Sequence, residues 1–324
     1  MPESVGLVST GSVVTIGAFD GLHVGHETIV NRVCTLAAQR KSRAVVMTFE
    51  PAPKAFFAGT KGDDRLMCFR QRFERLQQLG VDMFFCPRFD AELANQSADD
   101  FVRHWLLEVL HCRHIVVGDD FRYGRERTGT FASLRSAGQS FGFEVERTDS
   151  VVVGGERVSS TAIREALRLG QIYRVSEFLG RPYAVVDRVR HGQKLGRTLG
   201  FPTANLSLHR RLVPRHGVYA VRVSGAGLTN HAGVASLGTR PTVADNGAVL
   251  LEVHVLDVSR DMYGQRLRVE FIDYLRPEAR FESLDAMVVQ MHNDCDRARH
   301  ALAMAGNGEQ GNGRNARRDG SGGQ

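Results

Sequence analysis

The chain has 324 residues, of which 42% are hydrophobic and 24% charged, a composition that excludes disordered and fibrous proteins. This length is enough for two domains of ordinary size. The formal net charge is +6, but part of the basic excess lies in a Gly- and Asn-rich tail after residue 305, so charge alone does not indicate nucleic acid.

The sequence carries no membrane or export signal that we recognise. No apolar run reaches the roughly 18–20 residues needed to cross a bilayer, and residues 1–10 lack the basic start and apolar core of a secretory signal. The five cysteines are scattered without a C-x-x-C pair, which favours reduced thiols over a zinc site or a disulfide framework. We therefore expect a cytoplasmic protein with no membrane partner.

Residues 11–180 alternate between strand and helix patterns. Short apolar runs predict strands at 12–19, 43–51, 81–86, 114–121 and 143–153. Apolar residues at helical spacing predict helices at 27–40, 69–80, 97–110 and 159–170. Ser97 caps the third of these helices, and Ser159 or Ser160 the fourth. The alternation predicts a doubly wound, mostly parallel sheet of the Rossmann-like α/β class.

The pattern changes after residue 180. Strand-like runs at 181–190, 217–225, 231–238, 249–259 and 265–275 follow one another, and a helix is expected only at 283–304. Closely spaced strands with a terminal helix indicate a small β-barrel. We expect domains at 11–180 and 181–305, with the boundary near 178–183, and a disordered tail at 306–324.

The stretch "TIGAFDGLHVGHETIV", residues 15–30, places two histidines in a glycine-rich turn between a strand and a helix. Open α/β sheets bind ligands at this position, and glycines let backbone N–H groups approach a phosphate beside a helix N-terminus. Two imidazoles there could donate to oxygens that gain charge as a phosphoanhydride breaks. The candidate residues are Gly17, Phe19, Asp20, Gly21, His23, Gly25 and His26.

Other interpretations of this stretch stay open on the residues alone. A tight turn with two surface histidines is the plain one. A metal site is a weaker one, because no carboxylate or cysteine lies at zinc-ligand spacing from the histidines. Neither a P-loop motif nor G-x-G-x-x-G occurs here, which disfavours a P-loop enzyme and a dinucleotide dehydrogenase.

Two later segments are expected to converge on the same pocket. The segment "VGDDFRYG", 117–124, carries Asp120 in a loop after a strand. The segment "VSSTAIR", 158–164, offers hydroxyls at a helix start and an arginine one turn later, which together can grip a triphosphate. Its candidate residues are Ser159, Ser160, Thr161 and Arg164. Taken alone, this segment is better explained as an ordinary serine cap with a solvated arginine; together with the histidine stretch, the triphosphate grip is favoured.

A second candidate site begins at "HGQKLGRTLGFPTANL", 191–206. Its backbone, helped by basic side chains, could wrap a polyphosphate, and its hard oxygens suit Mg²⁺. The candidate residues are Gly192, Lys194 and Arg197 for ATP, and Thr203 and Asn205 for ATP and the metal. Glu252, in the strand-like run "VLLEVHVLD", could act as a general base, although the residues alone favour a surface-facing strand glutamate.

These motifs resemble a known family. "GAFDGLHVGH", "FEPAPKAFF", "VGDDFRYGRERTGTF" and "VSSTAIREAL" are similar, in this order, to the H-x-G-H nucleotidyltransferases, and more closely to the adenylyltransferase half of bacterial bifunctional riboflavin kinase/FMN adenylyltransferases. "GRTLGFPTAN", "GVYAV", "LEVHVLD" and "LRPEARFESLDAM" resemble the riboflavin kinase half. The resemblance covers about residues 11–305. Single motifs such as Pro-Thr-Ala-Asn are weak, but the ordered set is specific.

The resemblance implies two ATP-dependent reactions: phosphorylation of riboflavin to FMN in a six-stranded C-terminal barrel, and adenylylation of FMN to FAD, with release of pyrophosphate, in the N-terminal domain. It implies Mg²⁺ as cofactor, bound through Thr203 and Asn205, and Glu252 as the catalytic glutamate of the kinase. It makes Arg276 and Phe281 candidates for flavin contacts. The implied partners are riboflavin, FMN, FAD and ATP, without nucleic acid; weak self-association is left open.

Two positions depart from the family's pattern. Val24 stands where family members often have a basic residue, and Asp120 where some have asparagine. They are where drift would show if one half were degenerate or retargeted to another cytidylyl or adenylyl acceptor. Two non-enzymatic alternatives are a nucleic-acid-binding module, which predicts steep salt dependence without ATP turnover, and a flavin-binding regulator.

Overall fold

A computed structural model describes residues 10–59, 65–192, 196, 199–208, 214–239 and 249–315, with side chains described up to residue 306. The chain forms two compact units, Met1–Ser160 and Thr161–Gln324. The division therefore falls within the helix α7 (Ser160–Leu169), ahead of the change of pattern at 178–183. One reason is that the end of α7 packs in the second unit, where the Arg215 backbone N–H donates to the Leu167 carbonyl at 2.9 Å.

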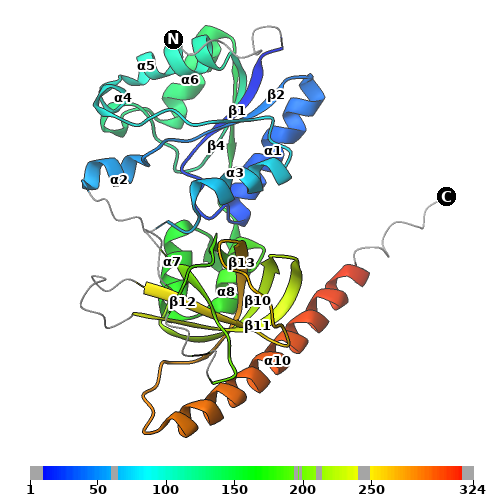
Figure 1. Ribbon diagram of the computed structural model, residues 1–324. Helices are drawn as coiled ribbons and strands as arrows, with labels where there is room; N and C mark the ends of the chain where they lie inside the picture. The colour runs from blue at the N-terminus through cyan, green and yellow to red at the C-terminus, as the bar shows by residue number, and fades with distance from the viewer. Residues whose placement is uncertain are drawn as a thin grey trace, which may run out of the picture. The chain divides into compact units, whose positions relative to one another are not determined.

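The first unit is built on a five-stranded parallel sheet with the strand order β3-β2-β1-β4-β5 (Figure 1). The strands are β1 (Ser12–Ile16), β2 (Arg43–Met47), β3 (Met83–Phe85), β4 (Cys112–Gly118) and β5 (Glu144–Thr148). The central strand β1 is buried along its whole length, as expected of a parallel strand covered on both faces. This sheet confirms the predicted Rossmann-like class, and after β5 the chain forms a separate short hairpin of β6 (Val152–Val153) and β7 (Glu156–Arg157).

Helices cover both faces of this sheet (Figure 1). Alternate residues of β1 point to opposite faces: Val13 packs with α1 (Val24–Arg40), and Val14 lies in the other cluster with residues of α5 (Ala98–Phe101) and α6 (Phe131–Phe141). The helix α3 (Phe69–Gln78) lies on the same face as α1, where Leu76 packs with Val30. The remaining short helices are α2 (Pro53–Ala58), α4 (Ala91–Asn95) and the 3₁₀ turn η2 (Arg125–Arg127).

Some predicted boundaries in the first unit move. The helix predicted at 97–110 begins at its Ser97 cap, whose side chain accepts from the Asp100 N–H, but from Val102 to Val109 it is a π-helix, η1. Apolar periodicity does not distinguish the two helix types. The predicted strand 43–51 ends at Met47, and α1 begins at Val24, three residues before the predicted helix.

The second unit contains a nearly closed six-stranded antiparallel barrel with the order β8-β13-β10-β11-β12-β9. The strands are β8 (Tyr183–Arg188), β9 (Ala204–Ser207), β10 (Gly217–Gly225), β11 (Leu228–Thr239), β12 (Val249–Val255) and β13 (Arg266–Arg276). A bridge between Arg190 and Asn205 joins the two ends of this order. The barrel confirms the fold expected from the resemblance; the strand β9 begins at the Ala-Asn of Pro-Thr-Ala-Asn.

Besides most of α7, two further helices are described in the second unit. The helix α8 (Ile172–Leu179), absent from the predicted elements, packs on β8 and β13. The helix α10 (Leu284–Asn315) packs Ala298 and Leu302 on the barrel strands β10 and β13 (Figure 1). It continues through 306–315, which the composition predicts to be disordered, since each added residue extends an existing helix by one hydrogen bond. The rest of the predicted tail, 316–324, lies outside the described residues.

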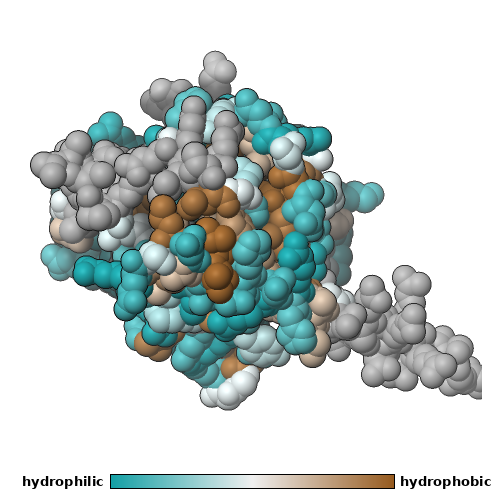
Figure 2. Space-filling model, turned by 60° about the horizontal axis from the view of Figure 1, so that its bottom comes forward, coloured by the Kyte–Doolittle hydropathy of each residue, from teal (hydrophilic) through white to brown (hydrophobic). Residues whose placement is uncertain are grey.

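The described surface is mixed in polarity. Figure 2 shows one face on which hydrophobic residues lie among hydrophilic ones. In α10 the exposed large apolar side chains are Leu284, Val289 and Met304. In the part of the chain that the structure describes, no helix is long and apolar enough to cross a membrane.

Candidate functional sites

The two histidines of the glycine-rich turn form one stacked pair at the start of α1. His23 is the N-cap of α1, and its Nδ1 accepts a hydrogen bond from the His26 backbone N–H at 3.3 Å. The two rings stack with centroids 3.6 Å apart and planes 16° apart. Because Nδ1 of His23 is an acceptor, the neutral ring carries its proton on Nε2. The pair therefore combines a fixed imidazole donor with the positive end of a helix.

Gly17 and Gly25 lie in tight contact with the rings around the pair. A β-carbon at Gly25 would lie 3.3 Å from Nδ1 of His23, and one at Gly17 would lie 3.2 Å from the Phe19 ring. Phe19 is buried and adopts a left-handed backbone conformation with φ of 47°. Its ring meets the His26 ring at 5.2 Å. The loop backbone and the histidine rings are thus packed as one body.

Asp20 and Ser160 connect the histidine loop to other parts of the chain through hydrogen bonds. The Asp20 carboxylate accepts from the Leu66 N–H at 3.0 Å and the Met67 N–H at 3.3 Å. The Asp20 carbonyl accepts from Ser160 Oγ at 2.8 Å. The structure thereby brings the start of "SSTAIR" to the histidine loop, as expected for Ser160. Thr161 and Arg164 follow in α7 within the second unit.

Asp120 lies in the turn after β4, and its side chain is 80% exposed. Its Oδ2 is 3.6 Å from Arg157 Nη2, whereas the neighbouring Asp119 accepts directly from Arg157 and from Ser150. Because β1 and β4 are parallel neighbours, their following loops lie at the same edge of the sheet. Asp120 therefore lies at the same edge of the sheet as the histidine loop, and its side chain is exposed to solvent.

The kinase candidates meet across two strands of the barrel. Glu252 on β12 pairs with Asn205 on β9 and with Ser236 on β11. Along β12 the residues Leu251 and Val253 are buried and Glu252 between them is half-buried, so Glu252 faces away from that core side. This register places a carboxylate beside a buried amide at the barrel wall.

Asn205 and Gly192 are in intimate contact. A β-carbon at Gly192 would lie only 2.3 Å from Asn205 Nδ2, so a larger residue there would displace the Asn205 amide. The Asn205 carbonyl accepts from the Arg190 N–H at 2.8 Å. Asn205 Oδ1 is buried and, among the described residues, has no hydrogen-bond partner. Thr203 directly precedes β9, whereas Lys194 and Arg197 lie outside the described residues.

Arg276 and Phe281, the residues predicted to contact a flavin, lie close together at and after the end of β13. The Arg276 guanidinium forms a two-pronged pair with Asp294 of α10, with Nε–Oδ1 at 2.9 Å and Nη2–Oδ2 at 2.7 Å. Its Cζ lies 5.9 Å from the Phe281 ring centroid. This arrangement ties the end of β13 to α10, so Arg276 has a structural partner whether or not it contacts a flavin.

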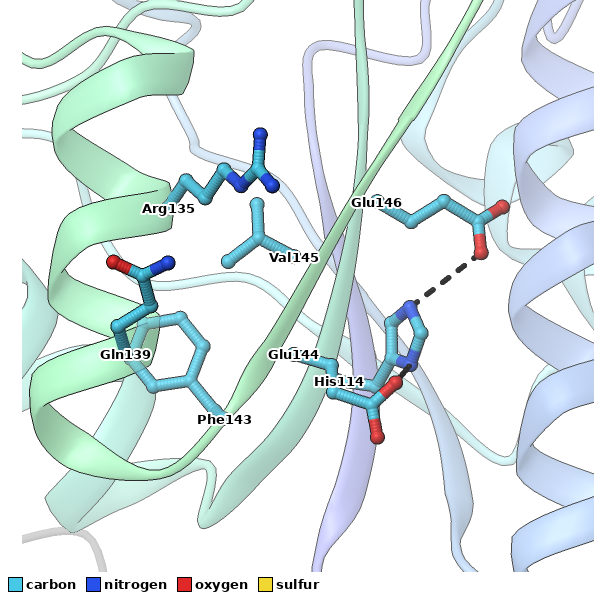
Figure 3. Close-up of a pocket in the computed structure, with 7 residues that line it drawn as sticks. All are labelled: His114, Arg135, Gln139, Phe143, Glu144, Val145 and Glu146. Atoms are coloured by element: carbon cyan, nitrogen blue, oxygen red, sulfur yellow. Dashed lines mark ion pairs between the residues drawn. The ribbon is translucent and has the colours of Figure 1, made fainter.

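A pocket of about 360 Å³ lies at the other end of β4 (Figure 3). In it the buried His114 ring lies between two carboxylates of β5, 3.4 Å from Glu144 Oε2 and 3.6 Å from Glu146 Oε2. Arg40 and Arg32 of α1 pair with these two glutamates and lower their pKa values by hydrogen bonding. Burial, helped by the charge of Arg40, lowers the pKa of His114, so the ring is neutral at pH 7.

One residue that contacts the histidine loop is absent from the sequence-based candidates. Arg72 of α3 is 4% exposed and donates from Nη1 to the Ala18 carbonyl, in the histidine loop, at 2.9 Å. The sequence signal that could have indicated its burial is its spacing: Arg72 lies four residues before the buried Leu76, on the same face of the helix. Within the described ranges, no group of three or more His, Cys, Asp or Glu side chains is placed to hold a metal ion.

Comparison with known proteins agrees with this division into two sites. The family model described as FAD synthetase matches residues 7–162, and the one described as riboflavin kinase matches residues 179–302. The first match contains the histidine pair and the second contains Glu252 and Asn205. The chain therefore combines two transferase modules, and each module contains one of the two candidate sites.

Full-length relatives match nearly the whole chain. Bifunctional riboflavin kinase/FMN adenylyltransferases are 42% identical in Haemophilus influenzae, over 90% of this chain and 94% of the relative, and 43% identical in Escherichia coli K12, over 88% and 90%. The crystal structure of a macrolide-efflux protein from Streptococcus pneumoniae matches with a TM-score of 0.81 and 30% identity, over 90% of this chain and 94% of that one. The chain belongs to the family of bifunctional riboflavin kinase/FMN adenylyltransferases, with the FAD synthetase half N-terminal and the riboflavin kinase half C-terminal.

Proposed function

We propose that this chain makes FAD from riboflavin in two ATP-dependent steps, with FMN as the intermediate. Residues 181–305 phosphorylate riboflavin, and residues 11–180 adenylylate FMN and release pyrophosphate. The observation that carries this assignment is the separation of two phosphate-handling clusters: the stacked pair His23–His26 belongs to the first unit, and the cross-strand pair Glu252–Asn205 belongs to the second.

In the kinase step, Glu252 takes the proton of the ribityl 5′-hydroxyl as its oxygen attacks the γ-phosphorus of ATP, and ADP leaves. The support is positional: Glu252 is half-buried and pairs across the strands with Asn205, which contacts Gly192 at the start of the predicted phosphate-binding loop. Lys194 and Arg197 of that loop would contribute charge against the phosphates.

The residues near Asn205 fit Mg²⁺. Asn205 Oδ1 is a buried oxygen without a protein partner among the described residues, and hard oxygens of this kind are what Mg²⁺ accepts. Thr203 would supply a second oxygen, and ATP phosphates and water would supply the others. When bound, the ion would neutralise phosphate charge. Gly192 packs against the Asn205 amide and so keeps the proposed ligand atom, Asn205 Oδ1, in place.

In the adenylyl-transfer step, a phosphate oxygen of FMN attacks the α-phosphorus of ATP and pyrophosphate leaves. A phosphate monoester is already anionic, so this step requires orientation and charge stabilisation rather than a base. His23 and His26 supply donors at the helix N-terminus, and Ser159, Ser160, Thr161 and Arg164 supply the triphosphate grip. The contact of Ser160 with the Asp20 carbonyl supports this grouping.

We also place the protein in the cytoplasm. Its five cysteines are free, as expected of a reducing compartment. The expected partners are small molecules: riboflavin, FMN, FAD and ATP.

The division of labour is tested with His26→Ala and Glu252→Gln. We expect His26→Ala to accumulate FMN from riboflavin without FAD, and Glu252→Gln to make FAD from supplied FMN but no FMN from riboflavin. Mixing the two variants should restore FAD formation from riboflavin, since FMN can pass between molecules. Loss of both activities from folded His26→Ala would contradict the separation of the sites.

A further inference from the structure

We propose that Arg72 is a positioning residue for adenylyl transfer, because its guanidinium fixes the histidine loop, residues 17–23, from outside the active site. The inference rests on the adenylyltransferase activity of the first unit. It concerns a side chain of α3 whose contacts are with the Ala18 carbonyl, Glu50 and two aromatic rings.

Arg72 is held in one orientation by its surroundings. Its Cζ lies 5.7 Å from the Phe69 ring centroid and 5.8 Å from that of Phe84. Its Nη1 donates to the Ala18 carbonyl at 2.9 Å, and its Nη2 donates to Glu50 Oε2 at 3.3 Å. Glu50 therefore pairs the charge of the buried guanidinium and two of its nitrogens donate, whereas Nε is buried without a hydrogen-bond partner among the described residues.

Glu50 orients the guanidinium from its other side. Its carboxylate also accepts from Arg65, with both nitrogen–oxygen distances at 2.6–2.7 Å. Glu50 is thereby shared between one strongly paired arginine and Arg72. The direction of Arg72 Nη1 toward Ala18 is set by this shared carboxylate and by the two aromatic rings.

The contact at Ala18 acts on the most constrained part of the loop. The Ala18 carbonyl and the Phe19 N–H belong to one peptide plane, so holding the carbonyl limits rotation at Phe19. Phe19 has φ of 47° and Leu22 has φ of 42°, conformations that large side chains rarely adopt. Both side chains are buried, so the loop keeps this conformation only while its surroundings enforce it.

A short series of contacts links this peptide to the reactive groups. The Phe19 ring packs on His26 at 5.2 Å, and His26 stacks on His23 at 3.6 Å. If the Ala18–Phe19 peptide rotated, the Phe19 ring would move and the histidine stack would follow. Catalysis by oriented donors is sensitive to such shifts, since a displacement of about 1 Å can cost on the order of a hundredfold in rate.

The test compares Arg72→Met, which keeps the apolar stem without the guanidinium, with Arg72→Lys and with the matched control Arg70→Met. Arg70 is on the same helix, is exposed, and pairs with its neighbour Glu74. The kcat and KM of FAD formation from FMN and ATP are measured, and riboflavin kinase activity of the same samples serves as the internal reference. Ring NMR signals of His23 and His26 are recorded without substrates.

We expect Arg72→Met to lower kcat of adenylyl transfer by about 30- to 100-fold, with KM values within about threefold and kinase activity unchanged. Arg72→Lys, which keeps the charge, should lie between this variant and the wild type, and Arg70→Met should match the wild type. The histidine ring signals should shift in both Arg72 variants but not in Arg70→Met.

Unchanged kcat, or a raised KM with unchanged kcat, in folded Arg72→Met would overturn the proposal. If Arg72→Met does not fold, Arg72→Lys carries the test, and unmoved histidine signals there would overturn it. A wild-type protein that forms no FAD would instead refute the assigned activity, whereas the NMR comparison would still report on the positioning.

Discussion

Replacing Arg276 separates a structural role from the flavin contact that the family resemblance implies. Arg276 pairs through two nitrogens with Asp294, which is 2% exposed and also accepts from Gln290 Nε2 at 2.9 Å. In Arg276→Met the Asp294 carboxylate would stay buried. It would lose its three charge-assisted contacts with Arg276 and keep the hydrogen bond from Gln290. Removing one partner of a buried ion pair lowers the free energy of unfolding by about 3–5 kcal/mol. Because the Gln290 donor remains, we expect a loss of about 3 kcal/mol.

The assay must report on the second unit alone. The single tryptophan, Trp105, lies in the first unit, so its fluorescence monitors that unit and serves as the control. Hydrogen exchange of β13 amides in the native state monitors the barrel. We expect Arg276→Met to lower the free energy of opening of β13 by about 3 kcal/mol, with Trp105 unfolding in urea unchanged.

Two further variants sharpen this result. Arg276→Met/Asp294→Leu should return to within about 1 kcal/mol of the wild type, since apolar replacement of a whole buried pair is often neutral. Arg299→Met, which removes an exposed pair with Asp257, should cost less than about 1 kcal/mol. Wild-type stability of Arg276→Met together with a raised KM for riboflavin would refute this reasoning and favour the flavin contact.

Two other variants test single contacts. Gly192→Ala should reduce riboflavin kinase activity and leave FAD formation from supplied FMN unchanged, because its β-carbon would lie 2.3 Å from Asn205 Nδ2; a wild-type kinase rate in product chromatography would contradict this. His114 has a lowered pKa in the folded state, so the unfolded chain binds its proton first, and the stability of the first unit should fall as pH drops below the ordinary value of 6.5. The neighbouring glutamates, whose pKa values are also lowered, titrate below 4.5. His114→Gln should therefore flatten the dependence of Trp105-monitored unfolding between about pH 7.5 and 5.5, and an unchanged slope would count against a buried neutral ring.

The fold class was predictable because its signals are local. Apolar runs and helical spacing mark β1, β2, β4 and their helices, and the turn containing His23 falls where one pattern changes to the other. A parallel sheet then places the loops after β1 and β4 at one edge. The pairing of Glu252 with Asn205 was not predictable from either segment alone, because strand register depends on contacts across the barrel.

What could not be predicted depends on partners distant in sequence. Arg72 is one of several arginines in α3, and nothing local shows that its carbonyl partner is Ala18, 54 residues away. Arg276 matches a family motif, yet its ion pair with Asp294 requires α10 to pack on the barrel. The π-helix at Val102–Val109 differs from an α-helix only in hydrogen-bond register, which apolar spacing does not resolve.

The central claim is that one chain converts riboflavin to FAD through FMN. The most direct measurement is a time course of the purified protein with riboflavin, ATP and Mg²⁺, in which chromatography separates riboflavin, FMN and FAD. We expect FMN to appear first and FAD to follow with release of pyrophosphate. Formation of neither flavin product, or an accumulation of FMN that is never converted to FAD, would contradict the account.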